Sequence, residues 1–92
     1  MELEPRLLRY FIAVAEERHF GRAAQRLHIS QPPLSYAIRQ LEELLGASLL
    51  ERTSRHVALT EAGRVLYREA QGLLRQADEV GRLVRRVDAG LR

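Results

Sequence analysis

The sequence predicts a mainly helical fold with one short β-hairpin and a long C-terminal helix. Apolar residues recur at helical spacing in four segments, and a polar stretch between two short apolar runs interrupts the last two. The last segment also carries a heptad pattern over more than three heptads. A chain of 92 residues is sufficient for one small domain.

The first two helices are predicted over Pro5–Arg18 and Gly21–Leu27. Proline suits the first position of a helix, and Gly21 is a tolerable N-cap. The expected apolar face of the first helix consists of Leu8, Phe11, Ile12 and Ala15, widened by Leu7 and Val14. In the second helix Phe20, Ala23, Ala24 and Leu27 share this spacing, and the small alanines allow another helix to cross closely.

The third helix is predicted to start at Pro32 or Pro33 and to stop at Gly46, within the stretch ISQPPLSYAIRQLEELLG. Leu34, Ile38, Leu41 and Leu45 form its apolar face. Ser30 cannot make the usual N-cap bond, because the two prolines have no N–H to donate to its hydroxyl. The Ser30 hydroxyl and the Gln31 amide are then free for an outside acceptor such as a phosphate, or the hydroxyl bonds water or the turn backbone.

Residues 47–60 predict the hairpin. Leu49-Leu50 and Val57-Ala58-Leu59 have the character of short strands, and the polar stretch from Arg52 to His56 lies between them. No Asn-Gly or Asp-Gly pair marks the turn.

The fourth helix is predicted from an N-cap at Thr60, with Glu61 in its first turn, to near Leu91, a length of about 45 Å. Its heptad seam consists of Leu66, Ala70, Leu73, Ala77, Val80, Val84, Val87 and Leu91. The other sixty or so residues cannot cover a seam of this length, so a second copy of the chain is expected on it as a homodimer partner. The alternative is that the helix folds back on its own domain.

Charge is distributed unevenly. All 15 basic residues are arginine, and the formal net charge is +3. No acidic residue occurs from Arg18 to Leu41 or from Arg52 to Thr60. Two such windows in a small domain indicate a polyanionic partner, although chance clustering on a solvated surface would look the same.

The close link between the second and third helices predicts a helix-turn-helix, and the basic hairpin extends it to a winged form. In that geometry the third helix enters the major groove of double-stranded DNA by its N-terminus, and the hairpin reaches the backbone or the minor groove. The Pro32-Pro33 step could press on a thymine methyl group.

Residues Leu8 to Gly63 resemble the DNA-binding domain of LysR-type transcriptional regulators. The resemblance rests on the aromatic-rich first helix, the Ala-Ala helix, Ser-Gln-Pro, QLEELLG, LLER and LTEAG. It implies a bacterial regulator with a winged helix-turn-helix over residues 1–60 and a linker helix over residues 61–92. The linker helices are expected to pair antiparallel, so that the dimer reads a promoter inverted repeat. It also implies that the family's effector-binding domain is absent from this chain and that a small-molecule effector acts only on the full-length protein.

The resemblance assigns DNA contacts to individual residues, to which the residues themselves add Ser30, for its free hydroxyl, and Arg39, for its guanidinium one turn after Tyr36. The expected DNA-binding residues are Arg22, Ser30, Gln31, Pro32, Pro33, Ser35, Tyr36, Arg39, Arg52, Thr53, Ser54 and Arg55. The expected dimer residues are Leu66, Ala70, Leu73, Ala77, Val80 and Val84. Tyr36 departs from the arginine that many relatives carry after the serine of PLS, and tyrosine cannot make arginine's bidentate contact to guanine. It could instead touch a phosphate or a thymine methyl group, or contact no base at all.

Other classes of function have less support in the sequence. There is no cysteine, no apolar run long enough to span a membrane, and no signal peptide at the N-terminus, which predicts a cytoplasmic, nucleoid-associated protein. His19, His28 and His56 are the histidines, and only Glu16-Glu17 beside His19 weakly suggests a metal site. We therefore expect no cofactor, no metal and no catalysis. A protein–protein dimerisation module remains as a rival, and the basic hairpin does not favour it.

Overall fold

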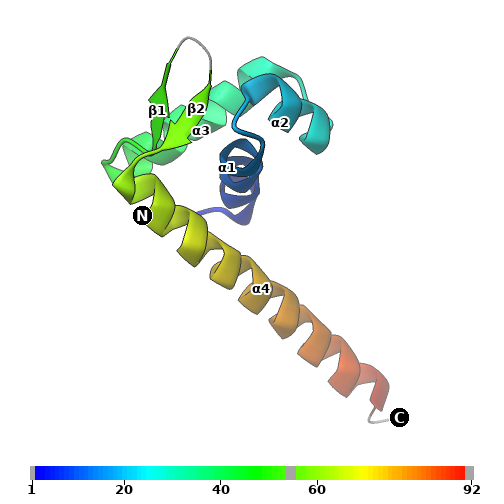
Figure 1. Cartoon of the computed structure of the whole chain (residues 1–92). Coiled ribbons are helices and arrows are strands. Elements are labelled where there is room, and N and C mark those ends of the chain that lie inside the picture. Colours follow the sequence, from blue (N-terminus) through cyan, green and yellow to red (C-terminus); the bar gives the residue numbers. More distant parts are fainter. Residues whose placement is uncertain (1, 54–55, 91–92) are drawn as a thin grey trace.

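The computed structural model describes residues 2–53 and 56–90. In these ranges the elements are α1 (Pro5–Glu17), α2 (Phe20–Leu27), α3 (Gln31–Leu45), β1 (Leu50–Arg52), β2 (Val57–Leu59) and α4 (Glu61–Gly90). The first three helices and the hairpin form a head, and α4 projects from it as a rod (Figure 1). The extents of 57 × 26 × 19 Å reflect this rod. The predicted fold class is confirmed.

Helix α1 is the central element of the head, because it contacts α2, α3, α4 and β2. Its buried side chains are Leu7, Leu8, Phe11, Ala13 and Val14. Ile12 and Ala15, which were expected in the core, are only half-buried. Because α2, α3, α4 and β2 all contact α1, its buried face is wider than a single amphipathic stripe. That buried face includes Ala13, which lies outside the predicted stripe.

Helix α2 begins at Phe20 and is capped by His19, so the prediction of Gly21 as its N-cap is wrong. The Nδ1 atom of His19 accepts a hydrogen bond from the backbone amide of Arg22 at 3.0 Å. An unprotonated imidazole nitrogen is an acceptor and can take the place of the usual serine or aspartate oxygen.

The turn between α2 and α3 is His28-Ile29-Ser30. His28 ends α2 in the left-handed conformation, with φ of 59°, and the Ile29 amide bonds back to the Ala24 carbonyl at 3.0 Å. Ala23 and Ala24 are both buried, and α2 contacts both α1 and α3. The expectation that this alanine pair permits a close crossing is confirmed.

Helix α3 begins at Gln31, one or two residues before the predicted start at Pro32 or Pro33. Ser30 is its N-cap by position, but its side chain makes no capping hydrogen bond. This is the predicted effect of Pro32 and Pro33, which occupy the positions that normally donate to a cap. Gly46 ends the helix with φ of 67°, as expected of a C-terminal glycine.

The hairpin is antiparallel, with Leu50 opposite Leu59 and Arg52 opposite Val57. Its first strand begins at Leu50 rather than at Leu49. The Leu49 amide instead donates to Oε2 of Glu42 on α3 at 2.8 Å. A side chain of α3 therefore holds the chain in place just before it enters the hairpin.

The start of α4 is fixed against the base of the hairpin. The Thr60 hydroxyl accepts from the Gly63 amide at 3.0 Å, which confirms the predicted N-cap, and donates to the Ser48 carbonyl at 2.7 Å. The Thr60 amide donates to the Leu49 carbonyl at 3.1 Å. A Cβ atom on Gly63 would lie 2.1 Å from that carbonyl oxygen, so this crossing requires glycine.

Beyond its first turns α4 separates from the head. Gly63 and Ala70 are its buried residues, and Leu66 and Tyr67 pack partly against the core. Further along, large apolar side chains are exposed: Leu73 (51%), Val80 (50%), Leu83 (44%), Val84 (63%) and Val87 (58%). The later part of the predicted seam is thus uncovered by this chain, and Leu91 lies outside the described residues. No helix in the described ranges is long and apolar enough to cross a membrane.

Gly63→Ala is expected to lower the free energy of unfolding by about 1–3 kcal/mol, because the added methyl group overlaps the Leu49 carbonyl and the backbone must shift. Urea unfolding at a fixed protein concentration measures this change.

Gly72→Ala is the matched control. A Cβ atom at this position would meet only the Arg75 guanidinium, at 3.9 Å. Removing a glycine from a helix interior should raise the free energy of unfolding by about 1 kcal/mol. Equal effects of the two substitutions would contradict the close approach at Gly63.

Candidate nucleic-acid interface

The N-terminal ends of α2 and α3 lie together on one side of the head. A Cβ atom built on Gly21 would lie 3.9 Å from the side-chain oxygen of Gln31, so the first turns of the two helices are adjacent. Arg22, Ser30 and Gln31 are all exposed there. In the described part of the chain, the side chains of Ser30 and Gln31 form no hydrogen bond with another residue. Both remain available to an outside group.

Gly21 leaves room for the capping histidine. A Cβ atom at this position would lie 2.9 Å from Cε1 and 3.2 Å from Nδ1 of His19, which would displace the ring. The sequence interpretation considered His19 only as a weak metal ligand and missed its structural role. The sequence contained a sign of this role. His19 precedes by three positions the Arg22 amide, which has no partner within the helix, and Gly21 between them leaves room for the ring.

The outer face of α3 is polar and free of acid over its first half. Leu34, Ala37, Ile38 and Leu41 are buried on the inner face. Gln31, Pro32, Pro33, Tyr36, Arg39 and Gln40 are exposed, and Ser35 is half-buried at the flank. Tyr36 is 61% exposed, which is high for an aromatic side chain and leaves its ring and hydroxyl available to a partner.

Acidic side chains of α1 neutralise part of the first basic window. The Arg26 guanidinium bonds Oε1 of Glu16 at 2.7 Å and Oε2 of Glu17 at 3.3 Å. Arg22 donates to the Glu17 carbonyl at 3.0 Å, and its Nε lies 3.8 Å from the Glu17 carboxylate. From the sequence, both arginines are expected to contribute to the free positive charge of this window. In the structure both form ion pairs or hydrogen bonds with residues of α1.

Glu16 also bonds α4, and this contact dominates its electrostatics. The Tyr67 hydroxyl donates to Oε2 of Glu16 at 2.6 Å. This hydrogen bond, followed by that from Arg26, lowers the pKa of Glu16. The same contact raises the pKa of the Tyr67 hydroxyl, because only the protonated hydroxyl can donate this hydrogen bond to Glu16. The hydrogen bond that Arg26 donates to Glu16 also raises the pKa of Arg26.

Arg39 differs from Arg22 and Arg26. It has no ion-pair partner in residues 2–53 and 56–90, although Glu42 and Glu43 follow one turn later. These three residues border a shallow depression at the C-terminal half of α3. Arg39 is therefore the unpaired positive charge on the outer face of α3.

The wing, which is the β1–β2 hairpin with its turn, contacts α2 through one arginine and one aromatic ring. The Arg52 guanidinium lies 5.1 Å from the ring centroid of Phe20, a cation–π contact. Thr53 closes the hairpin, since its hydroxyl donates to the His56 carbonyl at 3.0 Å and accepts from the His56 amide at 3.1 Å. Ser54 and Arg55, the other predicted wing residues, lie outside the described residues. The stacked pair places Arg52 beside the start of α2.

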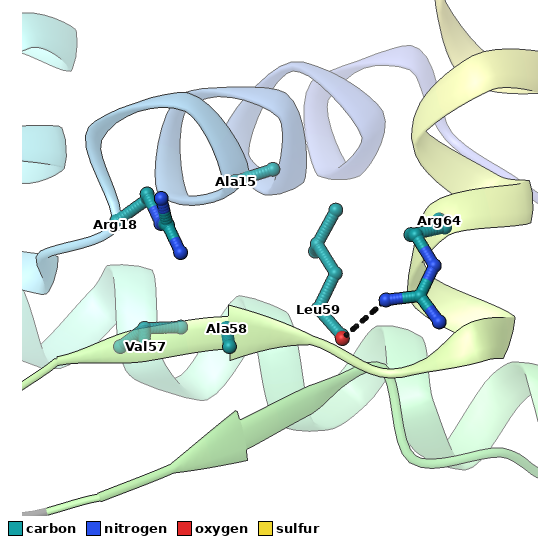
Figure 2. Close-up of a pocket in the computed structure, with 6 residues that line it drawn as sticks. All are labelled: Ala15, Arg18, Val57, Ala58, Leu59 and Arg64. Carbon is teal, nitrogen blue, oxygen red and sulfur yellow. Dashed lines mark hydrogen bonds between the residues drawn. The ribbon is translucent and has the colours of Figure 1, made fainter.

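A separate pocket of about 300 Å³ lies between α1, β2 and the start of α4. Figure 2 shows its lining residues, Ala15, Arg18, Val57, Ala58, Leu59 and Arg64. The Arg64 guanidinium donates to the Leu59 carbonyl at 3.2 Å. No residue of α3 lines the pocket, so it is not part of the α3 face. Among the described residues no group of three or more His, Cys, Asp or Glu side chains could hold a metal ion.

Comparison with known proteins gives consistent matches. A sequence model described as "Bacterial regulatory helix-turn-helix protein, lysR family" matches residues 5–64. The chain is 53% identical over 85 residues to the HTH-type transcriptional regulator XapR of Escherichia coli (strain K12), covering 92% of this chain and 29% of that protein. It is 57% identical over 72 residues to the HTH-type transcriptional regulator TfdT of Cupriavidus pinatubonensis, covering 78% of this chain and 32% of that protein.

Solved structures agree with these matches. The BenM DBD in complex with benA site 1 DNA is 48% identical, with a TM-score of 0.90, and the match covers 96% of this chain and 99% of that one. The CbnR DBD–DNA complex is 44% identical, with a TM-score of 0.85, covering 98% of this chain and 100% of that one.

The short α2, the tight turn, α3 and the two-stranded hairpin define a winged helix-turn-helix protein. The family match over residues 5–64 and the relatives identify the family: the chain belongs to the LysR family of bacterial regulatory helix-turn-helix proteins. It spans less than a third of the length of XapR and TfdT.

His19→Ala is expected to lower the free energy of unfolding by about 0.5–2 kcal/mol, because the Arg22 amide loses its acceptor. His19→Asn supplies a side-chain oxygen at the N-cap and should retain most of the stability. Thermal unfolding of both variants beside the unaltered chain tests this, and similar losses in the two would contradict a capping role.

Proposed function

We propose that this chain binds double-stranded DNA as a homodimer and that, as part of a LysR-family regulator, it directs transcription from a promoter containing an inverted repeat. Residues 1–60 would bind DNA, and residues 61–92 would form the linker and dimer helix. Helix α3 would enter the major groove by its N-terminal half. The observation that carries the proposal is the exposed outer face of α3, which is free of acid over its first half and is flanked by the start of α2 and the wing.

Each part of this surface has a suitable chemistry. Gln31, Ser35 and Arg39 offer donors for base edges, and Tyr36 offers a hydroxyl and a ring face. The Pro32-Pro33 step presents a stiff apolar edge to a thymine methyl group. Arg22, Ser30, Arg52, Thr53, Ser54 and Arg55 would contact the phosphate backbone, which fixes the position of the protein on the duplex.

Related proteins support DNA as the partner. The BenM DBD and the CbnR DBD were each solved with DNA and match nearly the whole of this chain. With identities of 44% and 48%, the same backbone arrangement would present the residues of this chain to a duplex.

The uncovered face of α4 supports the homodimer. Leu73, Ala77, Val80 and Val84 lie on one side of the helix at heptad spacing, and each is exposed. Water contact with so many apolar side chains is unfavourable, and a second α4 would remove it. Of the other proposed dimer residues, Leu66 is half-buried and Ala70 is fully buried within its own chain. We therefore place the main dimer contact at and beyond Leu73.

The wider role of the protein follows from its family. We propose a cytoplasmic regulator that binds rather than catalyses and whose full-length form responds to a small molecule. A dimerisation module that does not bind DNA is the competing function. A steep fall in DNA affinity with rising salt would favour DNA binding over that module, because phosphate contacts release counterions.

Gln31→Ala and Ser35→Ala should each weaken binding to the preferred duplex by about 1–3 kcal/mol and relax base preference at one position, because each removes a direct base contact. A duplex selected from a random pool and its single-base variants, measured by fluorescence anisotropy, provide the test. Gln76→Ala, on the exposed surface of α4, is the matched control. Unchanged base preference in Gln31→Ala and Ser35→Ala would contradict the assignment of α3.

Arg52→Ala should weaken binding to all sequences alike, because we assign Arg52 to the phosphate backbone. It should also make the DNA affinity fall less steeply with rising salt concentration. The same anisotropy assay, repeated at several salt concentrations, measures both effects.

Val80→Asp is expected to convert the dimer to monomers, because it places a charge in the apolar seam. Analytical ultracentrifugation at several concentrations measures the association. Arg75→Asp introduces the same residue about 140° around the helix and should leave the dimer intact. Persistent dimers in Val80→Asp would contradict the proposed interface.

A further inference from the structure

One carboxylate connects three helices of the head and rod. Oε2 of Glu16, on α1, accepts from the hydroxyl of Tyr67, on α4, at 2.6 Å. Oε1 of Glu16 bonds the guanidinium of Arg26, on α2, at 2.7 Å. The same guanidinium reaches Oε2 of Glu17 at 3.3 Å. The direction of α4 is therefore linked through Glu16 to the helix-turn-helix itself, and not to α1 alone.

Tyr67 lies where its contact can determine direction. The first turn of α4 is held by the Thr60 cap and the Gly63 crossing. Further along, Leu66 packs partly against the core and Ala70 is buried, but apolar contacts restrict the direction of the helix less sharply than a hydrogen bond does. Tyr67 adds such a hydrogen bond one turn before Ala70, the last buried residue described in α4. The C-terminal part of α4 projects away from the head (Figure 1).

A small tilt at this position has a large effect at the other end. From Tyr67 to Gly90 the helix extends about 35 Å. A tilt of about 5° would move its far end by about 3 Å, close to the rise of one base pair along DNA. In a dimer joined through α4, this displacement changes the distance between the two α3 helices.

We infer that the Tyr67–Glu16–Arg26 network sets the separation at which the dimer accepts its two half-sites. The inference rests on the proposed function, because it concerns the spacing between two copies of α3 on DNA. Tyr67 and Glu16 are positioning residues, since they act through the direction of α4 and not by contact with DNA. Their effect is on spacer length, whereas the residues of α3 act on base sequence.

The exposure of the network favours positioning over bulk stability. The side chains of Glu16 and Arg26 are 34% and 42% exposed, and ion pairs so accessible to water contribute little to folding. Directional hydrogen bonds on both oxygens of one carboxylate nevertheless restrict geometry. Removing one bond should leave the head folded and the angle of α4 less restricted.

The test measures binding against spacer length. A half-site is first selected from a random duplex pool with the unaltered chain. Affinities are then measured for the isolated half-site and for inverted repeats whose spacers differ by single base pairs. The unaltered chain should show one preferred spacing.

Tyr67→Phe keeps the ring and removes the hydroxyl. It should reduce the preference for the best spacing over its neighbours by about threefold to tenfold, the effect of losing one ordinary, water-accessible hydrogen bond, and leave half-site affinity unchanged. Glu16→Gln should act in the same direction. The double variant should lose no more than the larger single loss, because both substitutions break the same link.

Two matched controls separate positioning from general damage. Tyr10→Phe removes a hydroxyl on α1 that has no hydrogen-bond partner in the described part of the chain. Glu79→Gln breaks an ion pair with Arg82 that lies within α4. Both should keep the spacing preference of the unaltered chain.

The inference is overturned if Tyr67→Phe and Glu16→Gln keep that spacing preference. It is also overturned if they weaken the half-site and every repeat equally, since that indicates loss of fold or of the DNA surface. Failure of the proposed function has a different signature. The unaltered chain would then sediment as a monomer or bind repeats of every spacing alike, and the spacing inference would fail with it.

Discussion

The contact between Gly63 and the Leu49 carbonyl is the constraint on which the arrangement of the head and rod depends. The same carbonyl accepts the Thr60 amide, and Thr60 in turn caps α4. Two backbone segments can approach this closely only where one of them lacks a side chain. The approach closes the base of the hairpin and fixes the origin of α4, so the wing and the rod begin from the same backbone contact.

The fold was largely predictable because its signals are local. Helical spacing, the Thr60 cap and the Gly46 stop each depend on a few neighbouring residues, and the structure agrees with them. The N-cap of α2 was a local error, whereas two others arose where distant segments meet. Glu42 bonds the Leu49 amide and shortens the first strand, and the neighbours of α1 broaden its buried face. Sequence periodicity contains no information about such contacts.

The exposed face of the candidate site could be predicted from the sequence, but the pairing of its charged side chains could not. The exposed residues of α3 follow from the period of its buried face, so Tyr36 and Arg39 could be placed outside in advance. The pairing of Arg26 with Glu16 and Glu17 could not, because those residues belong to helices whose crossing is unknown from sequence. Nor could the stacking of Arg52 on Phe20. Positive charge in a sequence window therefore overstates the free charge on a folded surface.

The two adjacent prolines at the start of α3 also affect how this surface can be observed. Pro32 and Pro33 have no amide hydrogen, so amide-detected NMR and hydrogen–deuterium exchange give no signal from them. These positions lie on the exposed end of the helix, where a partner's effect should be largest. Experiments that follow amides alone would leave a gap there. Carbon-detected resonances of the proline rings, together with the exposed ring of Tyr36, report directly on that end of the helix.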